Sequence, residues 1–367
     1  MLRRIKIASI ALVVIVMLVI IGYSWFTGEP ADAYYARQAR MVLARTPIGV
    51  EFTQVDKRCN PARTVCKKAI TNYVVNILIR DRAEFVLVRA DGNSCASMTP
   101  GYVVKCGTRN GLNTPFIVTN TKRDAFTVYA IGRYLEVSKI AIKNAVYTPY
   151  SSEFNTFRMR RYGKHYLDHV VDRAYSKLVT RKIRSLSNRR AYVHTQVPRD
   201  MPKHLAVIEH ISPERFLHEP IQELVDEVYV TLALNQGGTY RYAKSSAGAL
   251  ALMQFMPKTY RALPAAYPRA GLKRDFVRGT VDHVNAMMAA VLLIDHDMSQ
   301  LPPTQRKQVF ADRTLYFMYA TSSYNGGSPR AKKLLSQNKH IVKDNENIEN
   351  RTYVQKALAA ADLSSFI

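Results

Sequence analysis

The sequence predicts an α+β protein, with a mostly helical C-terminal domain, a small mixed domain that carries disulfides, and one N-terminal transmembrane helix. Three observations predict it: an uncharged apolar start, β-rich runs among clustered cysteines, and helical spacing of apolar residues in the second half. A chain of 367 residues is long enough for two domains and an anchor. We expect the divisions to be 1–27, 28–155, 156–200 and 201–367.

The N-terminal segment predicts a membrane anchor. Residues 7–26 hold no charge, and about 20 apolar residues span a bilayer as a helix. Arg3, Arg4 and Lys6 precede the span, so the N-terminus should stay in the cytoplasm. We therefore expect a single-pass protein of the inner membrane with its main body in the periplasm. A cleaved signal peptide is the alternative, because "ADA" at 31–33 resembles a cleavage site.

The cysteines support an exported domain over 28–155. An even, clustered set in an exported protein predicts two disulfides, whose pairing the sequence leaves open. Short loops favour the pairs Cys59–Cys66 and Cys95–Cys106, and the absence of CxxC spacing disfavours zinc. The β-rich runs of this domain are 73–79, 85–88, 115–120 and 125–131.

The second half predicts helices. Apolar residues from 167 to 178 recur at spacings of four, three and four, in a basic segment with 11 Lys or Arg against two Asp over 157–190. This segment is either a solvated amphipathic helix or an arm that contacts an acidic surface. The helices expected beyond it are 203–211, 219–235, 256–266, 279–299, 304–322 and 349–364.

The charge balance points to an acidic partner. Lys and Arg outnumber Asp and Glu by 53 to 28, for a formal net charge of +25. Predicted export excludes nucleic acid as that partner. Peptidoglycan, anionic glycopolymers and lipid head groups remain.

Three sequence blocks predict the chemistry. They are "PKHLAVIEHISPERF" (202–216), "SSAGALALMQFMPKTY" (245–260) and "TLYFMYATSSYNGG" (314–327). The small residues of the middle block let a ligand approach the backbone, and its Gln254 is a polar group in an apolar patch. Together the blocks, which cover about 130 residues, resemble the lytic transglycosylases of the soluble lytic transglycosylase family, with a lysozyme-like fold related to the goose type.

Glu209 is the expected catalytic residue. It follows the apolar run "LAVI", and an apolar setting raises the pKa of a carboxyl group so that it donates a proton. The resemblance implies cleavage of the MurNAc-GlcNAc β-1,4 bond in peptidoglycan. In that reaction the muramic acid C6 hydroxyl attacks, one Glu serves as acid and then base, and a 1,6-anhydromuramyl product forms. No cofactor or metal is implied.

The resemblance also implies roles in substrate binding. Gln254 would bond sugar hydroxyl or N-acetyl groups, and Met253 and Met256 would form an apolar platform under the ring. Tyr324 would hold the Glu209 carboxyl through its hydroxyl. The remaining expected binding residues are Ser246 and Gly248 at the close approach, Asn325 in the cleft wall, and Tyr240, which either stacks on sugar rings or packs the inserted helix.

The chain departs from the family pattern in two places. His210 stands where the family has Ser, and 39 positions separate Glu209 from Gly248, so that 211–245 is an expected insertion. Glu223 and Glu227 are therefore fallback candidates for the acid. Two other functions stay open, a lysozyme-type hydrolase and a non-catalytic peptidoglycan-binding scaffold. The extra N-terminal domain suggests service to an envelope secretion or conjugation complex.

Overall fold

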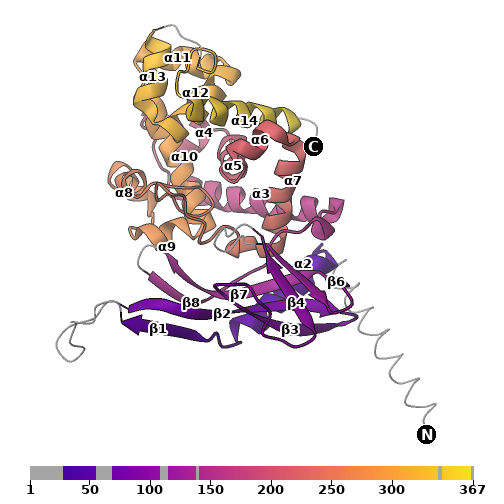
Figure 1. Cartoon of the computed structure of the whole chain (residues 1–367). Helices are drawn as coiled ribbons and strands as arrows, with labels where there is room; N and C mark the ends of the chain where they lie inside the picture. The colour runs from indigo at the N-terminus through magenta and orange to yellow at the C-terminus, as the bar shows by residue number, and fades with distance from the viewer. Residues whose placement is uncertain (1–27, 55–67, 108–114, 138–139, 338–340, 365–367) are drawn as a thin grey trace, which may run out of the picture. The chain divides into compact units, whose positions relative to one another are not determined.

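The computed structural model describes residues 28–54, 68–107, 115–137, 140–337 and 341–364 (Figure 1). The chain divides into two compact units, residues 1–163 with 233–236, and residues 164–232 with 237–367. The expected transmembrane segment at 7–26 lies outside the described residues. Among the helices that are described, none is both long enough and apolar enough to cross a membrane.

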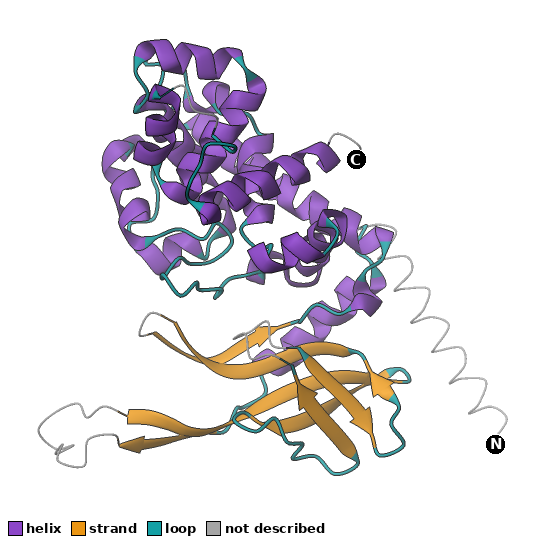
Figure 2. Ribbon diagram, turned by 45° about the horizontal axis from the view of Figure 1, so that its top comes forward, coloured by secondary structure: helices purple, strands orange, loops and turns teal. Residues whose placement is uncertain are grey.

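The first unit holds the strands (Figure 2). Its elements are α2 (Ala31–Ala44), β1 (Val50–Gln54), β2 (Lys68–Asp81), β3 (Glu84–Asp91), β4 (Tyr102–Cys106), β5 (Phe116–Asn120), β6 (Ala125–Phe126), β7 (Val128–Val137) and β8 (Ile140–Tyr147). All the pairings are antiparallel. The long strand β2 pairs with β1 over its first part, with β3 over its second, and with β7. Strands β4, β5 and β6 form a second sheet. The expected β-rich runs all fall on these strands.

Helix α2 packs against β7 and β8. It does so through a face of small residues, Ala33, Ala36 and Ala39, followed by Leu43, and all four are buried. On the strand side, a Cβ added at Gly132 would lie 3.0 Å from Oδ1 of Asn144 and in ordinary contact with Leu43. Small residues on both surfaces therefore bring the helix close to the sheet.

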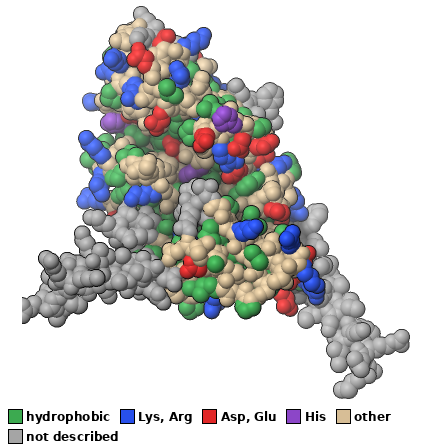
Figure 3. All heavy atoms as spheres, viewed as in Figure 1, with side chains coloured by type: hydrophobic (Ala, Val, Ile, Leu, Met, Phe, Trp, Pro, Cys, Tyr) green, Lys and Arg blue, Asp and Glu red, His purple; other side chains and the backbone are tan. Residues whose placement is uncertain are grey.

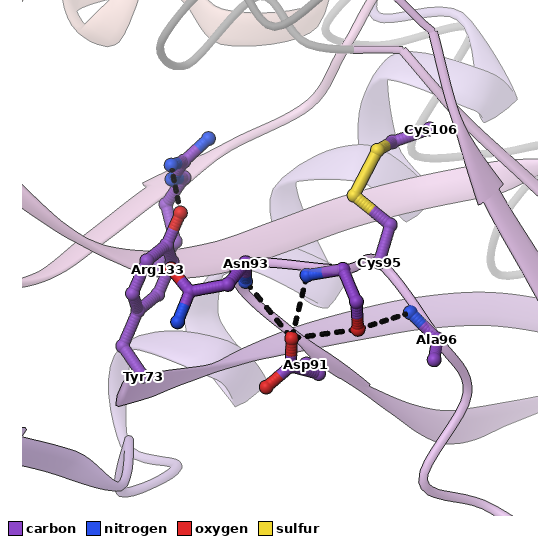
Figure 4. Close-up of a disulfide and its surroundings, with 8 residues drawn as sticks. Tyr73, Asp91, Asn93, Cys95, Ala96, Cys106 and Arg133 are labelled. Atoms are coloured by element: carbon purple, nitrogen blue, oxygen red, sulfur yellow. Dashed lines mark hydrogen bonds between the residues drawn. A yellow bond between two sulfur atoms is a disulfide. The ribbon is translucent and has the colours of Figure 1, made fainter. Parts of the chain in front are cut away.

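The disulfide Cys95–Cys106 joins the turn after β3 to the end of β4 (Figure 4). The turn is closed by Asp91, whose side chain accepts from the backbone N–H groups of Asn93 and Ser94. The structure confirms the predicted pairing of Cys95 with Cys106. The other expected pair, Cys59–Cys66, lies outside the described residues.

The second unit is helical. Its elements are α3 (Phe157–Thr180), which begins in the first unit, α4 (Val193–Gln196), α5 (Asp200–Ile208), α6 (Pro213–His218), α7 (Ile221–Asn235), η3 (Gln236–Gly238), α8 (Pro257–Ala266), η4 (Pro268–Ala270), α9 (Phe276–Thr280), α10 (His283–Ser299), α11 (Pro303–Ala311), α12 (Arg313–Gly326), α13 (Ser328–Ser336) and α14 (Ile348–Ser364). The division between the units falls inside α3, after residue 163, and not near residue 200. The reason is that Leu167, Val171, Ala174 and Leu178 are buried, so most of this basic helix belongs to the helical unit's core.

Helix α10 is the centre of this unit. Almost all its residues from His283 to Met298 are buried, as expected of a helix that is apolar all round. It contacts α4, α5, α8, α9 and α12. The expected helix at 304–322 is two helices, because the Asp312 side chain caps a new one by accepting from the Leu315 N–H. A strand region followed by a helical region confirms the α+β class.

Candidate active site

Glu209 lies at the C-terminal end of α5, whose residues from Leu205 to Ile208 are buried. Its side chain is partly buried, and its Oε1 accepts a hydrogen bond of 2.6 Å from the hydroxyl of Tyr353 on α14. Burial raises the pKa of Glu209 to about 7, against the opposing effects of Tyr353 and the Lys356 charge. The carboxyl can therefore donate and accept a proton near neutral pH.

Lys356 lies one turn after Tyr353 on α14, and it is buried. Its Nζ donates to the backbone oxygens of Ile208, at 3.1 Å, and Ile211, at 2.7 Å. Burial lowers the pKa of Lys356, while the nearby Glu209 charge raises it. The ammonium group thus ties α14 to the backbone on both sides of Glu209 and holds the carboxyl in place.

The ring of His210 is held in place by a stacking contact and a hydrogen bond. Its ring stacks on Tyr240, with centroids 3.5 Å apart and an angle of 6° between the planes. Its Nε2 lies 2.9 Å from the Leu252 oxygen, and because a carbonyl oxygen only accepts, this nitrogen carries the proton. Burial lowers the pKa of His210 to about 3, so the ring is neutral. Tyr240, expected either to stack on sugars or to pack, is buried against His210.

Tyr324 does not make the contact that the resemblance implies. Its hydroxyl donates to the backbone oxygen of Met253 at 2.7 Å, and the hydroxyl on Glu209 is that of Tyr353. Burial, and after it the Glu209 charge, raises the pKa of Tyr324. Met253 is completely buried, which excludes its side chain as a platform under a sugar ring in this conformation.

The rest of the middle block closes a turn. Gln254 has a left-handed backbone, with φ of 42°, and its Nε2 donates to the backbone oxygens of Ala251 and Ala243. Gly248 is also left-handed, with φ of 94°, and open space lies beside its Cα. Ser246 is exposed, and Met256 has 40% of its surface exposed. Ser246, Gly248 and Met256 are thus within reach of an outside molecule, as are the exposed Ala247 and Lys258 of the same block.

Asn325 joins two helices. Its Oδ1 accepts from Nδ2 of Asn350, a fully buried residue of α14. The Oδ1 of Asn350 in turn accepts from the Ser322 hydroxyl on α12 and from Nδ2 of Asn345. This network fixes α14, and with it Tyr353, against α12.

The fallback candidates Glu223 and Glu227, and Glu219, which shares an arginine with Glu227, lie in surroundings that differ from those of Glu209. Glu227 pairs with Arg215 at 2.8 Å, and Glu219 pairs with the same guanidinium at 2.7 Å. Glu223 is exposed on α7. Glu219 and Glu227 are partly buried, as Glu209 is, but both are paired with Arg215, and only Glu223 is exposed. Across the described ranges, no group of three or more His, Cys, Asp or Glu side chains is arranged to hold a metal ion.

Sequence reasoning missed Tyr353 and Lys356. The only available signal was their spacing of three on the helix expected at 349–364, which places them on one face.

Comparison with known proteins identifies no relative of the chain. No protein-family model, curated protein or solved structure matches it.

Proposed function

We propose that the helical unit is a lysozyme-like lytic transglycosylase that cleaves the MurNAc-GlcNAc β-1,4 bond of peptidoglycan. The observation that carries the proposal is the Glu209 carboxyl, which burial keeps protonated up to about pH 7 and which the Tyr353 hydroxyl orients. A general acid for a glycosidic oxygen needs this combination of a raised pKa and a fixed position.

The proposed reaction uses one carboxyl group twice. Tyr353 donates to Oε1 of Glu209, so Oε2 carries the proton that passes to the leaving O4 of the neighbouring sugar as the C1–O4 bond breaks. The muramic acid C6 hydroxyl then forms the C1–O6 bond and gives its proton to the same carboxylate. The products are a 1,6-anhydromuramyl end and a new 4-hydroxyl end, and Glu209 is again protonated.

The surroundings of the other carboxylates favour this reaction over hydrolysis. A retaining or inverting glycosidase uses a second carboxylate beside the bond that is cleaved. Glu219 and Glu227 are paired with Arg215, and Glu223 is exposed on α7. An attacking hydroxyl supplied by the substrate itself makes a second acid unnecessary.

We also propose that the protein acts in the periplasm, anchored in the inner membrane through residues 7–26. The Cys95–Cys106 disulfide supports an oxidising compartment, and the net charge of +25 suits an anionic wall polymer. The strand-bearing unit would then serve a partner, such as an envelope secretion or conjugation complex that needs a local gap in the wall.

The test is mass spectrometry of the soluble products when the purified full-length chain acts on purified peptidoglycan. We expect anhydromuropeptides from the wild type and a loss of about 100- to 10,000-fold with Glu209→Gln. The matched control is Glu223→Gln, an exposed fallback candidate, which should keep its activity. Products with reducing ends would identify a hydrolase, and binding of peptidoglycan without any release would identify a scaffold.

A further inference from the structure

A cleft of about 760 Å³ in the helical unit has four Lys or Arg and two Asp among its eleven lining residues, and Glu209 is not one of them. The basic residues are Arg241, Lys273, Arg274 and Arg278. Figure 3 shows Lys and Arg side chains over the part of this unit that holds α8 and α9, and Arg278 of α9 is one of the lining residues. The lining of this recess therefore carries an excess of positive charge.

The two carboxylates of the cleft are already engaged. Asp282 pairs with Nζ of Lys273 at 2.8 Å, and the Asp275 side chain accepts from the backbone N–H of Arg278. Within the part of the chain that the structure describes, no ion pair involves Arg241, Arg274 or Arg278. Three guanidinium groups therefore remain available for an anionic ligand.

The cleft is built on fixed side chains. His283 lies in its lining, with Nε2 2.9 Å from the Thr239 oxygen and Nδ1 2.9 Å from the Tyr166 hydroxyl. The oxygen of Thr239 only accepts, so Nε2 carries the proton and Nδ1 accepts from Tyr166. The backbone of Lys273 is bonded on both sides, by Asn285 and by the Tyr260 hydroxyl. The base of the cleft is therefore fixed, while the exposed side chains of Arg241, Arg274 and Arg278 would become ordered when a ligand binds.

One short segment connects the cleft to the acid. Tyr240 stacks on His210, the neighbour of Glu209, while the adjacent Arg241 lines the cleft. Residues 240 and 241 thus link the side chain packed on His210 to the lining of the basic recess. We propose that this cleft binds the carboxylates of the peptide stems on the glycan that Glu209 cleaves, an inference that rests on the proposed function. Arg pairs with carboxylates through two parallel hydrogen bonds, which suits such a ligand.

The experiment measures binding of soluble peptidoglycan fragments to the full-length chain carrying Glu209→Gln, which does not consume them. One set of fragments keeps its peptide stems, and a matched set has had them removed by an amidase. We expect Arg274→Ser with Arg278→Ser to weaken binding of the stem-bearing set roughly tenfold and leave the stem-free set unchanged. The control, Arg189→Ser with Arg190→Ser, removes the same charge from exposed positions of the same unit and should change neither.

Three outcomes would overturn the inference: equal weakening by the control pair, equal affinity of the wild-type cleft for both sets, or a loss confined to binding of anionic phospholipid vesicles. The proposed function is judged separately, by anhydromuropeptide release from the chain with Glu209 intact. Stem-dependent binding without release would leave the cleft assignment standing and refute the reaction. If the Arg274→Ser and Arg278→Ser changes alter neither anhydromuropeptide release nor fragment binding, the proposed reaction stands and the cleft assignment is refuted.

Discussion

Two carboxyl groups of the helical unit, the buried Asp295 and the partly buried Glu209, lie in opposite surroundings. Asp295 on α10 accepts four hydrogen bonds, from the Ser185 and Ser187 hydroxyls, the Leu186 N–H and the Tyr267 hydroxyl. Glu209 accepts one, from Tyr353, within the described ranges. Asp295 ties a loop to the central helix, whereas Glu209 is left able to exchange its proton. The number of donors around a buried carboxyl thus separates a structural group from a reactive one.

The largest expected effect on stability comes from Asp295→Asn. The amide replaces an acceptor oxygen by a donor and weakens two of the four bonds, so we expect a loss of roughly 2–3 kcal/mol in the free energy of unfolding. Denaturant unfolding measures it. The control is Asp275→Asn at the exposed N-cap of α9, where Asn caps as well as Asp and the change should stay below about 0.5 kcal/mol. Equal losses of stability in Asp295→Asn and Asp275→Asn would show that the four hydrogen bonds of Asp295 do not give it a special structural role.

The same kind of substitution at Glu209 should act in the opposite direction. Folding raises the pKa of this carboxyl from 4.5 to about 7, so its own contribution to stability is fully present below pH 4.5 and is lost as pH rises to about 7. Glu209→Gln lacks this loss, and we expect it to be more stable than the wild type at pH 8 by on the order of 1–2 kcal/mol. The gain should vanish near pH 5. Thermal unfolding across this range measures it, and a gain independent of pH would contradict the assignment.

A smaller effect distinguishes the two tyrosines. The Tyr353 hydroxyl bond lowers the pKa of Glu209, so Tyr353→Phe should raise that pKa and move the basic limb of the pH–activity profile to higher pH. Activity should also fall several-fold, because the carboxyl loses its orienting bond. Tyr324→Phe is the control, since its hydroxyl bonds the Met253 oxygen. If the basic limb of the pH–activity profile moves in Tyr324→Phe and not in Tyr353→Phe, Tyr324 would be the residue that holds the Glu209 carboxyl, as the resemblance implied.

The fold was predictable where local patterns decide it. The all-round apolar run of α10, the β-rich run of β2 and the short loop between Cys95 and Cys106 each carry their own signal. The start of the helical unit was not, because the basic surface of α3 resembles a solvated arm. Only its packing shows that Leu167 and Leu178 belong to a core.

The candidate site was predictable only in part. Glu209 follows an apolar helical turn, and that neighbourhood is visible in the sequence. The burial of Met253 depends on tertiary packing, which turns one side of a tight turn inward. Tyr353 lies 144 residues from Glu209, and no local pattern relates them. A partner across such a distance becomes visible only when α14 is placed against α5.

Helix α14 is synthesised after Glu209 and the three sequence blocks, although it helps to position Glu209. The ribosome makes it last among the described elements, yet it brings both the hydroxyl on Glu209 and the ammonium that ties the flanking backbone. A nascent chain that has reached residue 340 already contains all three sequence blocks, but it has neither group. Under the proposed function, the acid would lack its positioning partners until α14 has been made, so synthesis of α14 would precede cutting of the wall.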